Sequence, residues 1–305
     1  LRYMFWVAFK GLQEKYDCLI GVDLLGLCVA GLFGILKRTP WVYLSLEIII
    51  SWDPYSPFLK FKKLEKWFSR RAAFTIVQDI YRAMLIADDN NIPLNKLVFL
   101  VNSPLGKPKY KRSRYWHNKF NIDQNKKILL YSGSLTDCMM VDELLQIPKS
   151  LSDNWVLILH TRSKINIDKL CLNKDITVHR SMYISNEPVP YSMLEELVSS
   201  SDIGIALYKM NSPNIVFTAK SSGKICQYLY CGVPVIATKM PYWDNSLFKY
   251  NSGITVQSIA EICAAVNEID RSYQKFVQGA INHFDNELSF EKDFDSFLER
   301  LNKSI

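Results

Sequence analysis

The sequence predicts an α/β protein whose strands form parallel sheets that helices cover on both faces. The most informative stretch is residues 221–238, SSGKICQYLYCGVPVIAT. A polar turn precedes a short helix, Gly232 suits the left-handed residue that ends a helix, and Pro234 is tolerated near the start of a strand. The run Val233–Ala237 is apolar without alternation, which is typical of a strand buried on both faces in a parallel sheet.

The second half of the chain alternates strands and helices regularly, which also favours a parallel sheet. The predicted strands are Lys127–Tyr131, Trp155–His160, Ile176–His179, Ile203–Tyr208 and Val233–Ala237. The predicted helices lie near 139–147, 192–200, 223–231, 258–268 and 289–302. Capping boxes are expected at Ser192 with Glu195 and at Ser258 with Glu261.

The first half has the same character with weaker signals. The predicted strands are Cys18–Val22, Trp41–Ile50, Phe74–Val77 and Leu97–Val101, and the predicted helices are Leu24–Leu36, Phe58–Ala73 and Tyr81–Asp88. Residues 104–126 are rich in Lys and Arg and have no apolar period, so they are interpreted as a linker. The predicted domains are therefore 1–122, including this basic linker, and 123–305.

Composition sets the broad class. The 305 residues are 49% hydrophobic and 22% charged, which suits two ordinary domains. The net charge of +7 is compatible with an acidic ligand or an anionic membrane, and no nucleic-acid motif is present, so no nucleic-acid partner is predicted. Seven Cys without a C-x-x-C pair favour free thiols and a cytoplasmic protein.

Two features bear on the membrane and on the start of the chain. The apolar stretch 19–36 contains Asp23 and several Gly, so a membrane span is not expected there. The chain begins with Leu1 and shows no signal peptide, which leads us to expect a fragment.

A candidate anion site lies at the start of the predicted helix 223–231. Helix N-termini that follow parallel strands bind anions, and Ser221 or Ser222 can cap this one. Lys224 and Gln227 are three residues apart and share a face, offering a cation and an amide. Gly133-Ser134 follows another strand, and a Gly there lets the backbone approach a ligand. The alternative is an ordinary βαβ unit with a surface Lys.

These motifs, in this order, resemble the nucleotide-sugar-binding domain of GT-B glycosyltransferases, especially glycosyltransferase family 4. The matching segments are 128–135 (ILLYSGSL), 201–208 (SDIGIALY) and 222–236 (SGKICQYLYCGVPVI), with weaker similarity at 16–20, 64–77 and 101–104. The resemblance implies two Rossmann-like domains facing a cleft, the first of them incomplete because opening βα units are lacking. It also implies a nucleotide diphosphate sugar donor and a sugar or lipid-linked acceptor.

The resemblance assigns donor-binding roles residue by residue. Gly133 and Ser134 should lie against the diphosphate, and Lys224 should neutralise it with help from the amides of Ser222 and Gly223. Gln227 stands where relatives often carry a Glu that binds the ribose.

The chain departs from the family pattern in two places. Ala219 and Gln227 replace two Glu that many relatives have eight residues apart, and the usual basic residues are missing from 135–140. Arg162 is a candidate substitute for the missing basic residues. No Asp-x-Asp carboxylate pair follows a predicted strand, so metal-independent transfer without a cofactor is expected.

Two carboxylates are catalytic candidates on the acceptor side. Asp23 and Glu47 each lie at or near the end of a predicted strand, where a group facing a ligand is expected. The alternative for Asp23, which we favour, is a helix cap. The alternative for Glu47 is a carboxylate that is only buried or at the rim.

Segment 57–73 is a candidate contact with the inner face of an anionic membrane. It interleaves aromatic and basic residues: Phe58, Phe61, Trp67 and Phe68 with Lys60, Lys62, Lys63, Lys66, Arg70 and Arg71. The alternative is an ordinary amphipathic helix packed on the sheet with its Lys residues in water. We favour it slightly, on the expectation that its aromatic residues all face the core.

The sequence therefore predicts a glycosyltransferase of the hexosyltransferase type, in surface polysaccharide or glycolipid synthesis. Two alternatives stay open. One is a non-catalytic glycosyltransferase-like binding subunit, which the missing Glu pair motivates. The other is a nucleotide-sugar epimerase on the same fold.

Overall fold

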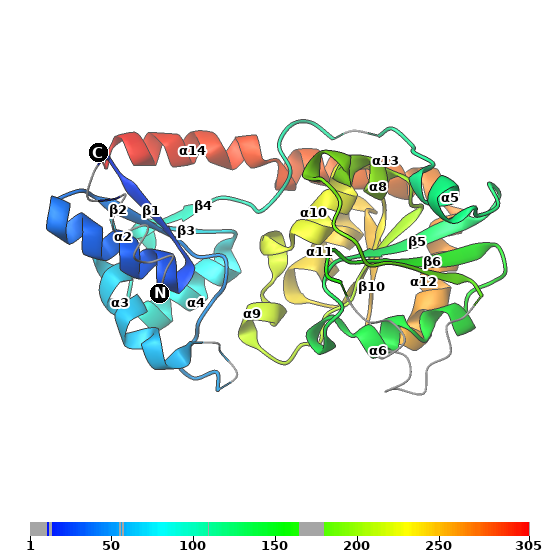
Figure 1. The fold of residues 1–305 in the computed structure, drawn as a ribbon, viewed down its shortest axis with the longest axis horizontal. Helices are drawn as coiled ribbons and strands as arrows, with labels where there is room; N and C mark the ends of the chain where they lie inside the picture. The colour runs from blue at the N-terminus through cyan, green and yellow to red at the C-terminus, as the bar shows by residue number, and fades with distance from the viewer. Residues whose placement is uncertain are drawn as a thin grey trace. The chain divides into compact units, whose positions relative to one another are not determined.

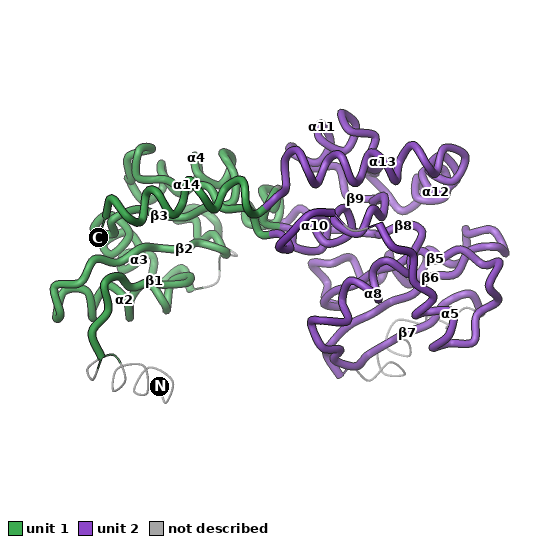
Figure 2. The backbone as a smooth tube through the Cα atoms, turned by 90° about the horizontal axis from the view of Figure 1, so that it is seen from above, with its two compact units in different colours: residues 1–102, 212–221, 290–305 green, residues 103–211, 222–289 purple. Residues whose placement is uncertain are grey.

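The chain divides into two compact units. The computed structural model describes residues 11, 14–54, 56, 58–108, 110–164 and 180–304. Unit 1 comprises residues 1–102, 212–221 and 290–305, and unit 2 comprises 103–211 and 222–289 (Figure 2). This differs from the predicted division at 122/123. The whole of the predicted linker 104–126 falls in unit 2, whereas the C-terminal helix and the short segment 212–221 fall in unit 1.

Unit 1 is built on a four-stranded parallel sheet of order β1-β2-β3-β4. Its strands are β1 (Leu19–Val22), β2 (Trp41–Leu44), β3 (Thr75–Val77) and β4 (Leu97–Phe99). Its helices are α2 (Asp23–Lys37), α3 (Lys62–Arg71), α4 (Ile80–Asn90), α9 (Pro213–Val216) and α14 (Phe290–Asn302), with short turns η1 (Leu59–Phe61), η2 (Leu94–Lys96) and η6 (Ala219–Ser221).

The two faces of this sheet are covered by different parts of the chain. Leu27, Phe68 and Ile86 bring α2, α3 and α4 onto one face. Helix α14 lies along the other face (Figure 1), and its Phe297 belongs to the same core cluster as Val42. The alternation of side chains along a strand separates these two sets. The C-terminal helix therefore completes the core of unit 1.

The predicted strand Trp41–Ile50 ends early, at Leu44. Ile48–Ile50 are buried but lie outside the sheet. Apolar runs of this kind do not distinguish a strand from a buried loop.

Unit 2 is built on a six-stranded parallel sheet of order β10-β9-β8-β5-β6-β7. The strands are β5 (Lys127–Ser132), β6 (Trp155–His160), β7 (Met182–Ser185), β8 (Ile203–Ala206), β9 (Val235–Thr238) and β10 (Gly253–Val256). The order reverses between β5 and β8, where Leu129 pairs with Ile203 and Leu130 with Gly204. Ligands of such sheets bind outside the carboxyl ends of the strands at this switch point. The predicted strand Ile176–His179 lies outside the described residues, and β7 and β10 had no counterpart in the prediction.

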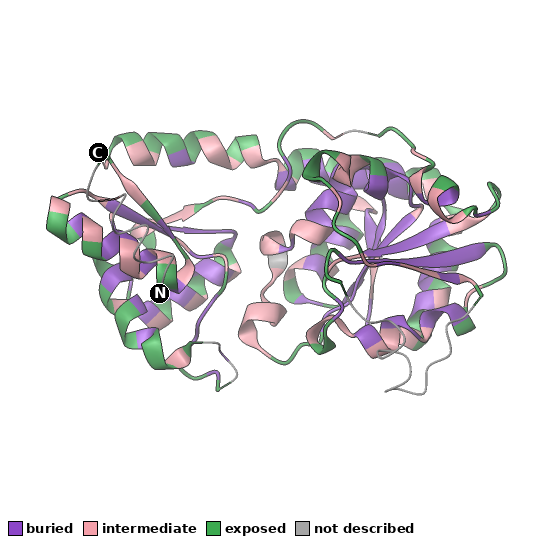
Figure 3. Cartoon of the chain, in the orientation of Figure 1, coloured by how far each residue is buried: buried purple, intermediate pink, exposed green. Residues whose placement is uncertain are grey.

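Helices cover both faces of this sheet, and its strands are the most buried part of the unit (Figures 1 and 3). They are α5 (Tyr115–Phe120), α6 (Val141–Leu144), α8 (Leu194–Ser199), α10 (Gly223–Tyr230), α11 (Pro241–Tyr250), α12 (Ile262–Arg271) and α13 (Tyr273–His283). Shorter turns are η3 (Asp137–Met139), η4 (Ile147–Lys149), η5 (Tyr191–Met193), η7 (Ile259–Glu261) and the π-turn η8 (Phe284–Leu288). Helix α5 lies inside the predicted linker.

The expected capping boxes do not form. Ser192 lies within η5, and neither it nor Ser258 makes a side-chain cap bond to a helix N–H. Ser258 instead donates to the Glu261 carboxylate at 3.4 Å, and that carboxylate accepts the N–H of Gln257 at 3.0 Å.

The residues predicted to start and end α10 have the expected conformations and contacts. The Ser222 hydroxyl caps the helix by accepting the N–H of Ile225 at 3.4 Å. Gly232 follows the helix with a φ of 66°, the left-handed conformation that Gly adopts without strain. Pro234 precedes β9, and its carbonyl accepts the N–H of Gly204 at 2.9 Å. No described helix combines the length and apolarity that crossing a membrane requires.

Candidate functional site

The ammonium group of Lys224 is buried and has no counter-charge in the described part of the chain. Lys224 lies in the first turn of α10, with its stem partly exposed and its Nζ buried. No acceptor lies within hydrogen-bonding distance of Nζ among the residues that the structure describes. Burial lowers the pKa of this ammonium group to about 7, and only Cys138 opposes that effect. An uncompensated buried charge is costly, so an anion bound here would be strongly favoured.

Aromatic rings surround this ammonium group. Nζ lies 4.0 Å from the centre of the Tyr131 ring and 5.1 Å from that of Tyr208. Tyr131 comes from β5 and Tyr208 follows β8, so Lys224 projects to the switch point of the sheet. The predicted pairing of an α10 cation with the strand ends is what the structure shows.

Gly133 lets the backbone after β5 approach Lys224. A Cβ at this position would lie 2.9 Å from Lys224 Cε and 3.1 Å from Nζ. The Gly133 N–H donates to the His160 carbonyl at 2.9 Å, which ties the loop to the end of β6. Any larger residue would displace the ammonium group or fill the space beside it.

A pocket of about 330 Å³ opens beside Gly133 at the carboxyl ends of β5 and β6. It contains the predicted Ser134 and the predicted substitute cation Arg162. The sequence prediction missed the other residues that line it: Ser132, His160, Val189, Pro190, Tyr191 and Leu194. The available signal was position, because Ser132 ends β5, His160 ends β6 and residues 189–194 follow β7.

His160 contributes a neutral ring to this pocket. Burial lowers its pKa, and the nearby Lys119 ammonium lowers it further. The ring Nδ1 lies 3.1 Å from the Ser185 hydroxyl at the end of β7. A neutral imidazole can both donate and accept, which suits a polar uncharged part of a ligand.

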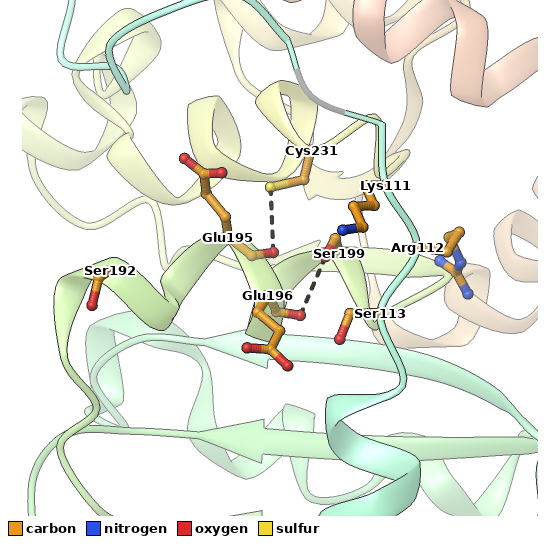
Figure 4. Close-up of a pocket in the computed structure, with 8 residues that line it drawn as sticks. All are labelled: Lys111, Arg112, Ser113, Ser192, Glu195, Glu196, Ser199 and Cys231. Carbon is orange, nitrogen blue, oxygen red and sulfur yellow. Dashed lines mark hydrogen bonds between the residues drawn. The ribbon is translucent and has the colours of Figure 1, made fainter.

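A second pocket of about 430 Å³ in unit 2 is less suited to an anion (Figure 4). Its lining residues are Lys111, Arg112, Ser113, Ser192, Glu195, Glu196, Ser199 and Cys231. Arg112 is paired with Asp202 at 2.6 Å, and two carboxylates lie on the wall. None of the predicted donor-binding residues lines this pocket, although it is the larger of the two.

Gln227 is buried one turn after Lys224. Its Nε2 lies 3.6 Å from Cys231 Sγ, so the amide nitrogen is turned along the helix. Its role toward a ribose stays a prediction. Ala219, the other position where relatives have a Glu, lies in η6 of unit 1.

The two catalytic candidates of unit 1 lie together at the carboxyl edge of β1 and β2. The Asp23 carboxylate accepts the N–H groups of Leu46 at 2.8 Å and of Glu47 at 2.9 Å. The helix-cap interpretation of Asp23 is wrong, because Val22 is the N-cap of α2 and no side chain caps this helix. Glu47 is exposed, and its carboxylate accepts a hydrogen bond from the Asn214 side chain.

Arg82 organises this edge of unit 1, and the sequence prediction missed it. The side chain is 1% exposed and donates to the carbonyls of Leu46 and Phe217 and to the Ser221 hydroxyl. Asn214 accepts from Arg82 at 3.1 Å and from the N–H of Ile48 at 2.9 Å. Burial lowers the pKa of Arg82, and the carboxylates of Asp79, Glu47 and Asp23 oppose this effect. No local signal predicts these partners, since most are more than a hundred residues away along the chain.

Segment 57–73 exposes part of its aromatic surface. Phe61, Leu64 and Trp67 are 37%, 46% and 41% exposed, whereas Phe68 is buried. The interpretation that all aromatic residues of this segment face the core is therefore wrong. Lys62 is not part of the exposed set, because it is buried and paired with Glu65 and Asp89, each at 2.8 Å.

Comparison with known proteins identifies the fold. No protein-family model matches the sequence, and no curated protein matches it. Among solved structures, Anabaena Alr3699/HepE in complex with UDP-glucose is similar at a TM-score of 0.77 and 14% identity, covering 97% of this chain and 82% of that chain. Sucrose-phosphate synthase from Thermosynechococcus elongatus is similar at a TM-score of 0.74 and 12% identity, covering 100% of this chain and 78% of that chain.

WaaG, a glycosyltransferase involved in lipopolysaccharide biosynthesis, gives a TM-score of 0.67 at 15% identity, covering 96% of this chain and 80% of that chain. These similarities confirm the predicted α/β fold with two Rossmann-like units, which is the GT-B fold of glycosyltransferases. Membership of family 4 stays a prediction. In the described part of the chain, no three His, Cys, Asp or Glu side chains group as metal ligands would.

Proposed function

We propose that this chain is a glycosyltransferase that binds a nucleotide diphosphate sugar in unit 2 and transfers the sugar to an acceptor. The observation that carries the proposal is the buried ammonium group of Lys224, which lies beside Gly133 at the switch point of the sheet and has no hydrogen-bond partner within the described ranges. The neighbour HepE was crystallised with UDP-glucose and with UDP and glucose, which supports a donor of this class. A hexosyl donor is part of the proposal.

The diphosphate would be held by Lys224 and by N–H groups at the start of α10. The first N–H groups of a helix have no intrahelical acceptor, and the helix dipole adds positive potential there. Gly133 and Ser134 would present their backbone to the diphosphate, and Arg162 would supply a second cation from the pocket beside them. Gln227 would contact the ribose.

Transfer breaks the bond between the sugar anomeric carbon and the diphosphate oxygen, and the electron pair stays on that oxygen. Lys224 and the helix amides would stabilise this developing charge without a metal or cofactor. The acceptor hydroxyl forms the new bond and loses its proton. Of the two candidates, we assign Glu47 as the base, because its carboxylate is exposed whereas that of Asp23 already holds two backbone N–H groups.

A lipid-linked acceptor would explain the exposed face of α3. Beside Phe61, Leu64 and Trp67, the exposed cations are Lys60, Lys63, Arg70 and Arg71. Lys60 lies 5.1 Å from the Phe61 ring centre and Arg71 lies 4.0 Å from that of Trp67. Each such cation near anionic lipid contributes ~1 kcal/mol, and the apolar side chains can enter the interface. We propose this face as a contact with the inner face of an anionic membrane, as a peripheral protein.

Vesicle co-sedimentation tests the membrane contact. The native chain should bind vesicles containing anionic lipid at low salt and release at high salt, and Trp67→Ser and Lys63→Glu should each weaken binding. Phe248→Ser is the matched control, because Phe248 is 84% exposed in unit 2. Binding that is independent of lipid charge would refute the electrostatic contact.

Turnover of a donor panel tests the proposed function. The native chain should bind at least one of several nucleotide diphosphate sugars in isothermal titration and, with an acceptor extract, release the matching nucleotide diphosphate. Lys224→Met should abolish both, whereas Lys275→Met, at an exposed position on α13, should not. Binding without any turnover would favour the non-catalytic subunit, and an epimerised sugar nucleotide would favour the epimerase.

A further inference from the structure

Tyr131 and Tyr208 each make two contacts in the site. The ring of each contacts the Lys224 ammonium group, and the hydroxyl of each bonds a second part of the site. We propose that these two tyrosines are positioning residues of the diphosphate site, which hold the Lys224 ammonium group and fix the two backbone segments beside it. The nature of the ligand rests on the proposed function, but the positioning role does not.

The rings provide the contacts of the ammonium group. At 4.0 Å from Tyr131 and 5.1 Å from Tyr208, Nζ is within the range in which an aromatic face attracts a cation. Both rings are buried, so water is kept from Nζ. The cation is thereby held in one place without a carboxylate that a phosphate would have to displace.

The hydroxyl groups fix the backbone on either side. Tyr131 donates to the Ser134 carbonyl and so closes the loop after β5. The Tyr208 and Ser222 hydroxyls lie 2.7 Å apart, and Ser222 is the residue that caps α10. One tyrosine therefore restrains the Gly133-Ser134 loop and the other restrains the start of the helix.

The electrostatics favour the same role. Burial raises the pKa of both tyrosines, that of Tyr208 to about 12, so neither becomes a phenolate that would neutralise Lys224. Other titratable groups near these two rings are the thiols of Cys138 on η3 and Cys226 on α10 and the buried phenol of Tyr228, whose pKa burial also raises. The site thus keeps a desolvated cation whose charge is available to a ligand.

The test uses the complete chain and two substitutions at each tyrosine. Tyr131→Phe and Tyr208→Phe retain the ring and remove the hydroxyl, so each should weaken binding of UDP-glucose about 5- to 10-fold, the effect of losing one hydrogen bond. Tyr131→Leu and Tyr208→Leu also remove the ring, so each should weaken binding further. Tyr242→Phe is the control. Tyr242 lies on α11, and its hydroxyl donates to the Glu287 carboxylate at 2.9 Å and not to a residue of the proposed site.

A readout without ligand separates positioning from a general structural effect. The ammonium group of Lys224 can be titrated by NMR in lysine-labelled protein, with Lys224→Met identifying its signal. Leucine is smaller than tyrosine and lets water reach Nζ, so the leucine variants should raise this midpoint from about 7 toward the value of an exposed Lys despite the lost ring contact. The phenylalanine variants should leave it near 7. An unchanged midpoint and unchanged affinity in variants that still unfold cooperatively would overturn the inference.

The two proposals fail differently. If no nucleotide sugar binds but the midpoint shifts and inorganic diphosphate binding falls in the leucine variants, the proposed donor is wrong and the positioning role stands. If UDP-glucose binds but all four tyrosine variants match the native chain, the positioning role is wrong and the proposed function stands.

Discussion

A methyl group on the Cα of Gly133 would lie 3.1 Å from the Nζ of Lys224. The loop after β5 and the first turn of α10 therefore meet at a cation and a residue without a side chain. Because Nζ has no acceptor in the described structure, the space beside this contact is where an anionic ligand would be stabilised.

Gly133→Ala should weaken nucleotide diphosphate binding with little effect on folding. The added methyl group meets the end of a flexible side chain, so Lys224 can move aside, but the moved ammonium group no longer lies where the ligand binds. We expect a loss of about 1–2 kcal/mol in binding, similar to that of a charge-assisted hydrogen bond. Isothermal titration measures it, and equal affinity for the variant and the native chain would contradict the contact.

Lys224→Met should stabilise the free protein while it removes binding. The native Lys224 pKa is lowered to about 7, so between pH 7 and the ordinary Lys value the unfolded chain binds the proton more tightly, and native stability rises with pH. The Met variant should gain about 1–3 kcal/mol in free energy of unfolding, and this gain should be largest below pH 7 and shrink as pH rises. Thermal unfolding of the native chain and of Lys224→Met at pH 6 and pH 9 measures this difference. A variant that is less stable at pH 6 would show that the cation is compensated.

Nucleotide-sugar affinity should fall as pH rises above about 7. The ligand's diphosphate favours the charged ammonium group, so binding raises the Lys224 pKa from about 7 and takes up a proton. Affinity should decrease by up to about tenfold per pH unit until the pKa of the complex is reached. Titration at pH 8 in two buffers of different ionisation enthalpy would detect the proton uptake. A flat profile from pH 6 to 9 would exclude Lys224 as the titrating group.

Gln227→Ala should weaken binding of a nucleoside diphosphate but not of inorganic diphosphate. A neutral hydrogen bond to ribose is worth ~0.5–1.5 kcal/mol, and Gln227→Leu should lose at least as much. Gln227 is 8% exposed, so Gln227→Glu would place a carboxylate in a buried position and should lower the thermal midpoint. Equal effects on both probes would mean that Gln227 supports the helix and does not contact ribose.

Glu47→Gln should lower turnover about 100-fold or more while donor affinity is unchanged, because a general base contributes 10²–10⁴-fold. Asp23→Asn keeps an oxygen acceptor for the N–H groups of Leu46 and Glu47 and should be nearly neutral. Asp23→Ala leaves both unsatisfied and should destabilise unit 1 by about 1–3 kcal/mol. Turnover and thermal unfolding distinguish these outcomes. A larger turnover loss in Asp23→Asn than in Glu47→Gln would assign the base to Asp23.

The strands and helices around α10 could be predicted because their signals are local. Ser222 caps, Gly232 turns the chain and Pro234 precedes a strand for reasons that concern only neighbouring backbone groups. The same holds for β6, whose bounds match the predicted Trp155–His160. Strands β7 and β10 were missed, although β10 is as long as the predicted β8 and β9 and follows the turn signal Asn251-Ser252-Gly253.

The domain division and the Asp23 interaction depend on packing between distant segments. Helix α14 is amphipathic in the sequence, but its place in unit 1 follows from Phe297 meeting Val42. Asp23 precedes a helix as a cap would, yet its carboxylate reaches the loop after β2. Neither outcome can be read from a pattern of a few residues, because both depend on which faces are brought together.

The sequence by itself determined the α/β class and the parallel character of the strands, and it predicted Gly133 and Lys224 as parts of a candidate anion site. Local backbone chemistry and apolar patterning are sufficient for these. Only the tertiary structure decided that the ammonium group of Lys224 is buried between Tyr131 and Tyr208 and has no acceptor in the described structure. It also decided that Arg82 joins strand ends to residues 214–221. The physical reason is that desolvation and charge pairing depend on all the groups around a side chain, and folding brings those groups from distant parts of the chain.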